Sequence, residues 1–179
     1  MIYVFLANGF EECEALAPID ILRRAGFNVI TVGVNGNIAI GAHNIPVLCD
    51  TTTDKITFEN LEAVILPGGM PGTLNLENDK IVEKAIDYAA KNGILIGAIC
   101  AAPSVLGHKG LLDGKKATCF PGFEKDLLGA TVTNTSVVRD GNIITAKGAG
   151  VAFDFGFELL AYLKDEKTAN DLKIQMMFK

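Results

Sequence analysis

Apolar runs that alternate with amphipathic stretches are the feature of this sequence that most constrains its fold. Residues 2–7, 63–66 and 94–99 are almost continuously apolar and rich in Val, Ile and Leu. Strands of that kind are buried on both faces, because a strand with one solvated face alternates apolar with polar residues. Amphipathic helical patterns occupy 11–25 and 77–91. The alternation predicts an α/β fold with a doubly wound, mostly parallel sheet and helices on both faces.

The remaining patterns add smaller elements to this outline. Residues 37–40 and 45–49 read as two short strands, which predicts a small antiparallel excursion. Residues 139–142 (RDGN) supply the turn of a hairpin between two apolar runs. Pro18 falls inside the first helix and should kink it unless the helix begins later. Further elements are expected as strands at 27–34, 116–119 and 130–133 and as helices at 101–108, 149–163 and 168–177.

Composition narrows the class of protein. The 179 residues are 49% hydrophobic and 21% charged, which fits a single globular domain over residues 1–179. The net charge of −5 argues against a nucleic-acid partner, which would favour a basic surface. No apolar run reaches the roughly 18 residues of a membrane span, and the first residues lack the basic segment of a signal peptide. We therefore expect a cytoplasmic location and no membrane partner.

The four cysteines, Cys13, Cys49, Cys100 and Cys119, are widely scattered. A disulfide framework is not expected, because such frameworks are typical of smaller, secreted chains. A zinc site is not expected either, because its ligands are usually closely spaced in the sequence. The sequence also lacks the GxGxxG pattern of dinucleotide sites and the GxxxxGK[ST] phosphate loop. Reduced thiols, no metal and no cofactor are the expectation.

Cys100 differs from the other three cysteines, because residues 98–102 (AICAA) have the form of a nucleophile elbow. In such a strand-to-helix turn the central residue is strained, and only small side chains fit two positions before and after it. The N–H groups of the next helix should lower the pKa of the thiol to roughly 3.5–7.5. The alternative is that Cys100 is a small buried residue. His43 and His108, the two histidines, are expected at the surface.

Polar and glycine-rich segments follow other strands and should reach the same edge of the sheet, where open parallel sheets bind ligands. Glu14 could donate a proton to the sulfur, with its pKa raised in a partly dry pocket. Spacing alone does not separate it from Glu11 and Glu12, which better fit solvated positions at the helix N-terminus. Residues 67–69 (PGG) form either a turn or an oxyanion site made of backbone N–H groups. For residues 148–150 (GAG) the sequence leaves the same two alternatives open.

Several segments together resemble the ThiJ/PfpI superfamily, in the branch of the Parkinsonism-associated deglycase protein. They are NGFEECE at 8–14, APIDILRRAG at 17–26, LPGG at 66–69, AICAAP at 98–103 and TAKGAG at 145–150 followed by Phe153 and Phe155. The resemblance covers nearly the whole chain. It implies a flavodoxin-like domain of the class I glutamine amidotransferase type, usually a homodimer, with an oxidation-prone cysteine on the elbow.

The resemblance also implies roles for individual residues. It makes Glu14 the partner of Cys100 and the backbone of Gly69 and Ala101 the oxyanion pocket. Peptidase activity is not expected, because protease-like members carry histidine where this chain has Ala101. Phe120 and Gly68 should line the pocket. Phe120 stands where members of the closest branch often carry a histidine, so the cysteine and the glutamate would have to carry out all proton transfer.

The implied activity is that of a cofactor-free glyoxalase or deglycase. Its substrates would be methylglyoxal, glyoxal or their protein adducts, that is, small reactive aldehydes or glycated groups. The alternative is a redox-sensing stress protein or chaperone. In that case Cys100 is oxidised to a sulfinate that protonated Glu14 holds.

Overall fold

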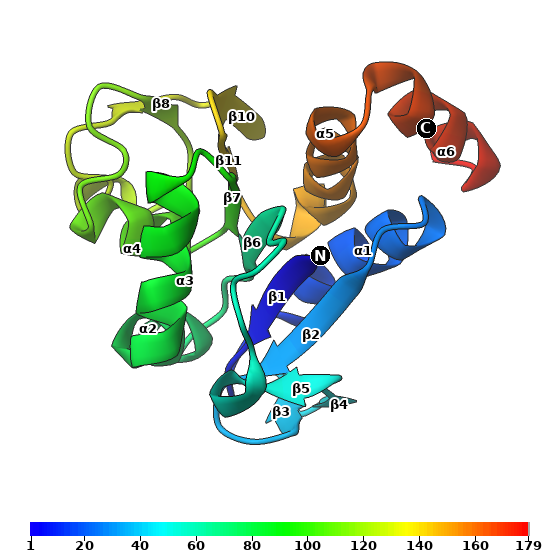
Figure 1. Cartoon of the computed structure of the whole chain (residues 1–179). Helices are drawn as coiled ribbons and strands as arrows, with labels where there is room; N and C mark the ends of the chain where they lie inside the picture. Colours follow the sequence, from blue (N-terminus) through cyan, green and yellow to red (C-terminus); the bar gives the residue numbers. More distant parts are fainter. Residues whose placement is uncertain (179) are drawn as a thin grey trace.

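The computed structural model describes residues 1–178 and is built on one seven-stranded sheet between two layers of helices (Figure 1). The strands are β1 (Ile2–Leu6), β2 (Val29–Gly33), β5 (Thr51–Thr52), β6 (Ala63–Leu66), β7 (Leu95–Ile99), β10 (Val137–Asp140) and β11 (Ile143–Ala146). They lie in the order β10-β11-β7-β6-β1-β2-β5, and every neighbouring pair except β10–β11 is parallel. The predicted fold class is confirmed.

The central strands are apolar throughout because both of their faces are covered. β1, β6 and β7 are buried at every position. Alternate side chains of these strands join two separate apolar clusters, one on each face of the sheet. For example, Ile65 belongs to one cluster, whereas Val64 and Leu66 belong to the other.

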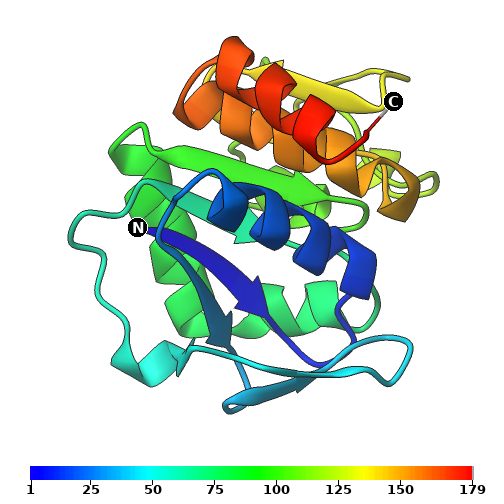
Figure 2. The ribbon, with the colours of Figure 1, turned by 90° about the vertical axis from the view of Figure 1, so that its right-hand side faces the viewer.

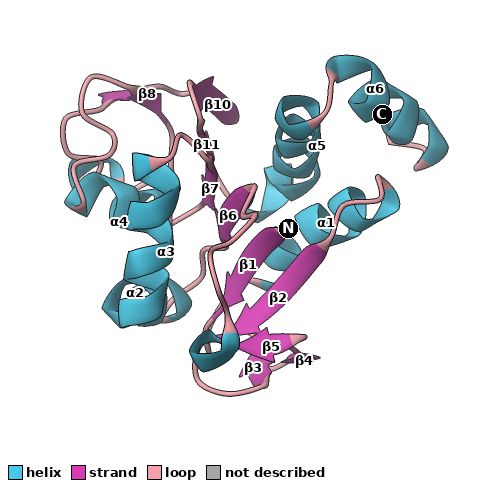
Figure 3. Ribbon diagram, in the orientation of Figure 1, coloured by secondary structure: helices cyan, strands magenta, loops and turns pink. Residues whose placement is uncertain are grey.

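Two groups of helices form the outer layers (Figures 2 and 3). The bounds are α1 (Glu12–Arg24), α5 (Ala152–Leu163) and α6 (Glu166–Gln175) on one side, and α2 (Gly72–Asn78), α3 (Lys80–Lys91) and α4 (Pro103–His108) on the other. α1 remains one helix through Pro18, which packs against Gly156 of α5, where a β-carbon would lie 3.0 Å from the Pro18 Cα. Within residues 1–178 no helix is long and apolar enough to cross a membrane.

The structure corrects one helix and shortens several strands. The helix predicted at 77–91 begins only at Lys80, as α3, because the Asp79 side chain accepts hydrogen bonds from the N–H groups of Ile81 (2.8 Å) and Val82 (3.0 Å). Residues 77 and 78 end α2, a helix that was not predicted. The antiparallel excursion is confirmed as β3 (Ile38–Ile40) paired with β4 (Pro46–Leu48). The strands predicted at 116–119 and 130–133 are the two-residue strands β8 (Lys116–Ala117) and β9 (Thr131–Val132).

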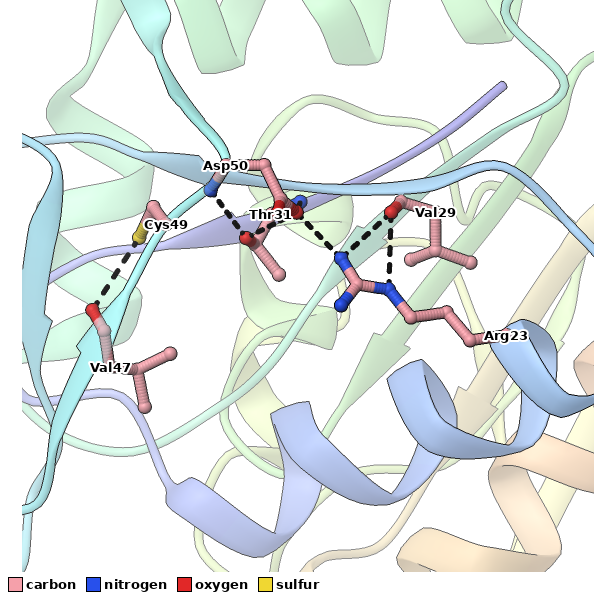
Figure 4. Close-up of polar contacts among 6 residues, drawn as sticks. All are labelled: Arg23, Val29, Thr31, Val47, Cys49 and Asp50. Atoms are coloured by element: carbon pink, nitrogen blue, oxygen red, sulfur yellow. Dashed lines mark hydrogen bonds and ion pairs between the residues drawn. The ribbon is translucent and has the colours of Figure 1, made fainter.

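Asp50 ties one end of α1 to the edge of the sheet (Figure 4). Its Oδ2 accepts hydrogen bonds from the N–H and the Oγ1 of Thr31, both at 2.8 Å, and from the Nη2 of Arg23 at 2.6 Å. Partial burial opposes ionisation of Asp50, but these hydrogen bonds prevail and hold its pKa below the ordinary value. Arg23 also donates to the Val29 carbonyl oxygen at 2.9 Å, so α1 is anchored directly to β2.

Candidate active site

The strand order brings four chain segments together at one edge of the sheet. β11, β7, β6 and β1 are consecutive neighbours and parallel, so the segments that follow them emerge side by side. Backbone hydrogen bonds join these segments. The Cys100 N–H donates to the Ala146 carbonyl oxygen at 2.8 Å, and the Glu11 N–H donates to the Gly68 carbonyl oxygen at 3.0 Å. Residues far apart in the sequence thus form one site.

Cys100 directly follows β7 and has a φ of +66°, a left-handed conformation that is rare for residues other than glycine. Ala98 and Ala102, two positions to either side, are both fully buried. Pro103 begins α4, where the missing N–H costs no hydrogen bond. The strained elbow expected from the sequence is therefore present, with a half-buried thiol at its tip.

Glu14 lies in the first turn of α1 with only 1% of its surface exposed. Its Oε2 accepts a hydrogen bond from the Gly68 N–H at 2.9 Å, and its carboxyl group lies beside the Cys100 thiol, which favours the ionised carboxylate. Only glycine fits at position 68, because a β-carbon there would lie 2.6 Å from the Cys100 Cβ and 2.7 Å from the Glu14 Oε2. The loop after β6 thereby holds the carboxyl group against the sulfur.

Burial changes the pKa of both groups. It raises the pKa of Glu14 to about 7, although hydrogen bonds from Cys100 and Gly68 favour the ionised form. Burial and, next, the charge of the Glu14 carboxylate together raise the pKa of the Cys100 thiol to about 12. Between those pH values the pair holds one proton. A thiolate forms in this range when that proton lies on Glu14.

The prediction of a lowered thiol pKa is therefore wrong. Burial and the neighbouring carboxylate outweigh the hydrogen bonds from the backbone N–H groups of Gly69 and Ala101 to the sulfur. The helix that begins at Pro103 has only six residues, so its dipole is small. The sequence pattern showed the helix N-terminus but not how close the carboxylate lies.

The backbone N–H groups of Gly69 and Ala101 lower the pKa of the Cys100 thiol, so both are near the sulfur, where the resemblance places an oxyanion pocket. Gly69 has a φ of +88°, and a β-carbon there would lie 2.5 Å from the Glu11 backbone nitrogen. Both facts require glycine. The two N–H groups are available to an oxygen that forms on a carbon bonded to the Cys100 sulfur.

Gly148 forms another wall of the site, which the sequence left undecided. A β-carbon at Gly148 would lie 3.7 Å from the Glu14 Oε1 and 3.9 Å from the Cys100 Sγ. The backbone N–H of the next residue, Ala149, slightly lowers the pKa of the Glu14 carboxyl group. The GAG segment before α5 is thus in contact with the reactive pair, a role that spacing could not have separated from that of a simple turn.

Phe120 lies at the mouth of this site. Its backbone N–H donates to the Cys100 carbonyl oxygen at 2.8 Å, and its ring lies 3.3 Å from the position of a β-carbon on Gly148. The residue is 48% exposed. Together with Gly148 and Val151 it lines an open apolar hollow of about 300 Å³. An apolar ring therefore lies beside the reactive pair, at the position where the resemblance gives related proteins a histidine.

The two histidines pair with carboxylates other than Glu14. His108 Nδ1 lies 2.6 Å from the Glu77 Oε1, and His43 Nδ1 lies 2.8 Å from the Glu12 Oε2. Glu12 is not solvated as predicted but only 5% exposed, because the segment at 41–43 closes over it. Among residues 1–178, the ligand atoms of Glu11, Glu12 and His43 are the one set of three close enough for a metal ion, all within 4.8 Å.

The fold and the site define a class: flavodoxin-like α/β proteins with a cysteine on a nucleophile elbow and a buried carboxyl group beside it. Within that class the chain belongs to the DJ-1/PfpI family, whose sequence profile matches residues 1–162. The membership predicted from the sequence is confirmed.

Individual relatives agree with this assignment. Protein dj-1beta of Drosophila melanogaster is 35% identical over 94% of this chain and 92% of its own length. Deglycase PH1704 of Pyrococcus horikoshii is 31% identical over 88% of this chain and 96% of its own. The solved structure of oxidized Toxoplasma gondii DJ-1 has a TM-score of 0.95 and 30% identity, covering 99% of this chain and 97% of that one.

Proposed function

We propose that this chain is a cofactor-free, cysteine-dependent glyoxalase or deglycase that acts on methylglyoxal, glyoxal or their protein adducts. The observation that carries the proposal is Cys100 on a strained elbow beside the buried carboxyl group of Glu14, whose pKa burial raises. Such a pair supplies both a thiolate and a proton carrier without another group. The similarity to a protein named a deglycase supports the same class of activity.

The proposed reaction begins with attack of the Cys100 thiolate on the aldehyde carbon of methylglyoxal, which forms a hemithioacetal. The developing oxyanion accepts hydrogen bonds from the N–H groups of Gly69 and Ala101. Glu14 then removes the proton from the former aldehyde carbon and returns it to the neighbouring carbon, which leaves a thioester of lactate. Water hydrolyses the thioester, releases lactate and restores the thiol. Overall, methylglyoxal and one water give lactate, with no net oxidation.

A second candidate function, redox sensing, uses the same atoms. Burial of Glu14 keeps its carboxyl group protonated up to about pH 7, so it can donate a hydrogen bond to an anionic, oxidised sulfur. Under this hypothesis mild peroxide adds two oxygens to Cys100 before it modifies the buried Cys49 and Cys119 or the exposed Cys13. Mass spectrometry of the peroxide-treated chain distinguishes this from indiscriminate oxidation.

The chain is also proposed to act as a homodimer, as the family resemblance implies. Support comes from an apolar hollow of about 390 Å³ between α1, the β3–β4 hairpin and α5. Leu16, Ile45 and Phe153 line it with 39%, 51% and 43% of their surfaces exposed. A second copy would cover these side chains. Sedimentation of the wild type and Leu16→Glu tests this: a dimer that Leu16→Glu converts to a monomer is expected, and a monomeric wild type refutes it.

Consumption of methylglyoxal with detection of lactate tests the enzyme proposal. Reduced wild type should be active, whereas Cys100→Ser and Glu14→Gln should each lose about 100-fold or more in rate. Cys13→Ser is the matched control, because it removes an exposed thiol outside the reactive pair. Undetectable turnover of both methylglyoxal and glyoxal by reduced wild type would refute the proposal and favour redox sensing.

A further inference from the structure

A second hollow adjoins the apolar hollow beside Phe120. It measures about 230 Å³ and is lined mainly by polar side chains, among them Thr118, Thr133, Asn134 and Lys147. Pro121 and Lys147 line both hollows, so the two meet there. Lys147 directly precedes Gly148, whose β-carbon position is 3.9 Å from the Cys100 sulfur. The polar hollow thus lies next to the reactive pair without including it.

Lys147 supplies a positive charge to this hollow. Its Nζ donates to the Asn134 Oδ1, and its backbone N–H donates to the Ser136 carbonyl oxygen at 3.0 Å, which fixes the position of the residue. The residue is half-buried. Across residues 1–178 no carboxylate forms an ion pair with Lys147. Two of the three donor positions of its ammonium group therefore remain for another acceptor.

Two hydroxyl groups in the walls of the same hollow also lack partners. The Oγ1 atoms of Thr118 and Thr133 are buried and form no hydrogen bond within the described chain. Thr118 is 1% exposed. Because both oxygens are fully enclosed, they lie behind the wall of the hollow, and the donors that an acceptor in the hollow can reach are those of Lys147.

One negative charge opposes an anion here. The Glu124 side chain lines the hollow as well, and its Oε2 accepts a hydrogen bond from the Gly122 N–H at 2.7 Å. That hydrogen bond engages one of its oxygens, but the charge remains. Glu124 should therefore weaken the binding of an anion that Lys147 favours, and the two residues give opposite, separately testable effects.

We propose that the polar hollow around Lys147 is a subsite for a carboxylate on the molecule that carries the aldehyde. This inference rests on the proposed function. A carbonyl carbon bonded at Cys100 would lie beside Gly148, and the rest of an adduct would extend past Pro121 toward Lys147. The favoured substrates would be methylglyoxal adducts of free amino acids or of chain termini that bear a carboxylate. Adducts with a neutral end would be poorer substrates.

The test compares two hemithioacetals of methylglyoxal, one made with N-acetylcysteine and one with the neutral N-acetylcysteinamide. Both adducts release the same free aldehyde, so a difference in kcat/KM reports the carboxylate. The wild type should prefer the charged adduct about 5-fold, in line with a partly exposed ion pair. Lys147→Met should bring the ratio of kcat/KM for the charged adduct to that for the neutral adduct close to one, and Glu124→Gln should raise this ratio. Lys91→Met, on α3, is the matched control for loss of a lysine.

A binding measurement keeps this inference separate from the enzyme proposal. N-Acetyl-S-methylcysteine, which carries no aldehyde, should slow alkylation of Cys100 by iodoacetamide more than its carboxamide does, and Lys147→Met should abolish the difference. If no adduct is turned over but the carboxylate compound still protects Cys100 better than its carboxamide does, the enzyme proposal is refuted and the subsite is supported. Turnover with equal kcat/KM for both adducts, or a ratio unchanged in Lys147→Met, would refute the subsite.

Discussion

Replacing Glu14 by Gln should stabilise the fold at alkaline pH but much less at acid pH. The carboxyl group has a pKa of about 7 in the folded chain against 4.5 for the solvated group, because it is buried. Its contribution to stability is therefore fully present below pH 4.5 and is lost as the pH rises through 7. Gln keeps the shape, can accept the hydrogen bond from the Gly68 N–H, and has no charge to bury.

The size of the effect follows from the two pKa values. Each pH unit between them corresponds to about 1.4 kcal/mol, so ionised Glu14 costs the fold about 3 kcal/mol at pH 8.5. At pH 5 most of the carboxyl groups are protonated in the folded chain, and the cost is below about 1 kcal/mol. The advantage of Glu14→Gln should therefore grow by about 2.5 kcal/mol between pH 5 and pH 8.5. Any constant loss from imperfect packing of the amide cancels in this difference.

Urea unfolding of wild type and Glu14→Gln at both pH values, under reducing conditions, measures this quantity. Glu12→Gln is the matched control from the same helix turn. Glu12 is also buried, but hydrogen bonds from His43 outweigh burial and hold its pKa below the ordinary value. Glu12→Gln should thus destabilise the fold at pH 8.5, and less so in acid. An advantage of Glu14→Gln that is equal at both pH values would refute the reasoning about Glu14.

Two further predictions follow from the same contacts. At pH 8.5 Glu14→Gln should speed alkylation of Cys100 by iodoacetamide, measured by mass spectrometry, even though it stops turnover, because the Glu14 carboxylate raises the pKa of the thiol. Slower alkylation would mean that the carboxylate does not hold the proton on sulfur. Asp50→Asn should lower the free energy of unfolding by about 1 kcal/mol in urea titrations at pH 7, because it weakens the hydrogen bonds from Thr31 and Arg23. Unchanged stability would show that this anchor between α1 and the sheet edge is dispensable.

The alternation of apolar runs with amphipathic stretches was enough to predict the doubly wound sheet. That pattern is local, and it reports directly that both faces of β1, β6 and β7 are covered. The elbow at 98–102 could also be predicted from a local pattern, since the turn sterically requires small residues two positions before and after Cys100. The separate helix α2 and the start of α3 at Lys80 were missed, although Asp79 carries the capping signal in the sequence.

Only the tertiary structure decided how the site works. Spacing alone could not choose among Glu11, Glu12 and Glu14, because it does not show which carboxyl group faces the neighbouring strand end. The family resemblance indicated Glu14, and the structure places that carboxyl group beside Cys100. The sequence pattern also predicted the wrong direction for the pKa of Cys100. A pKa depends on burial and on charges brought close by folding, and the strand order β11-β7-β6-β1 that creates this proximity is a property of the whole sheet.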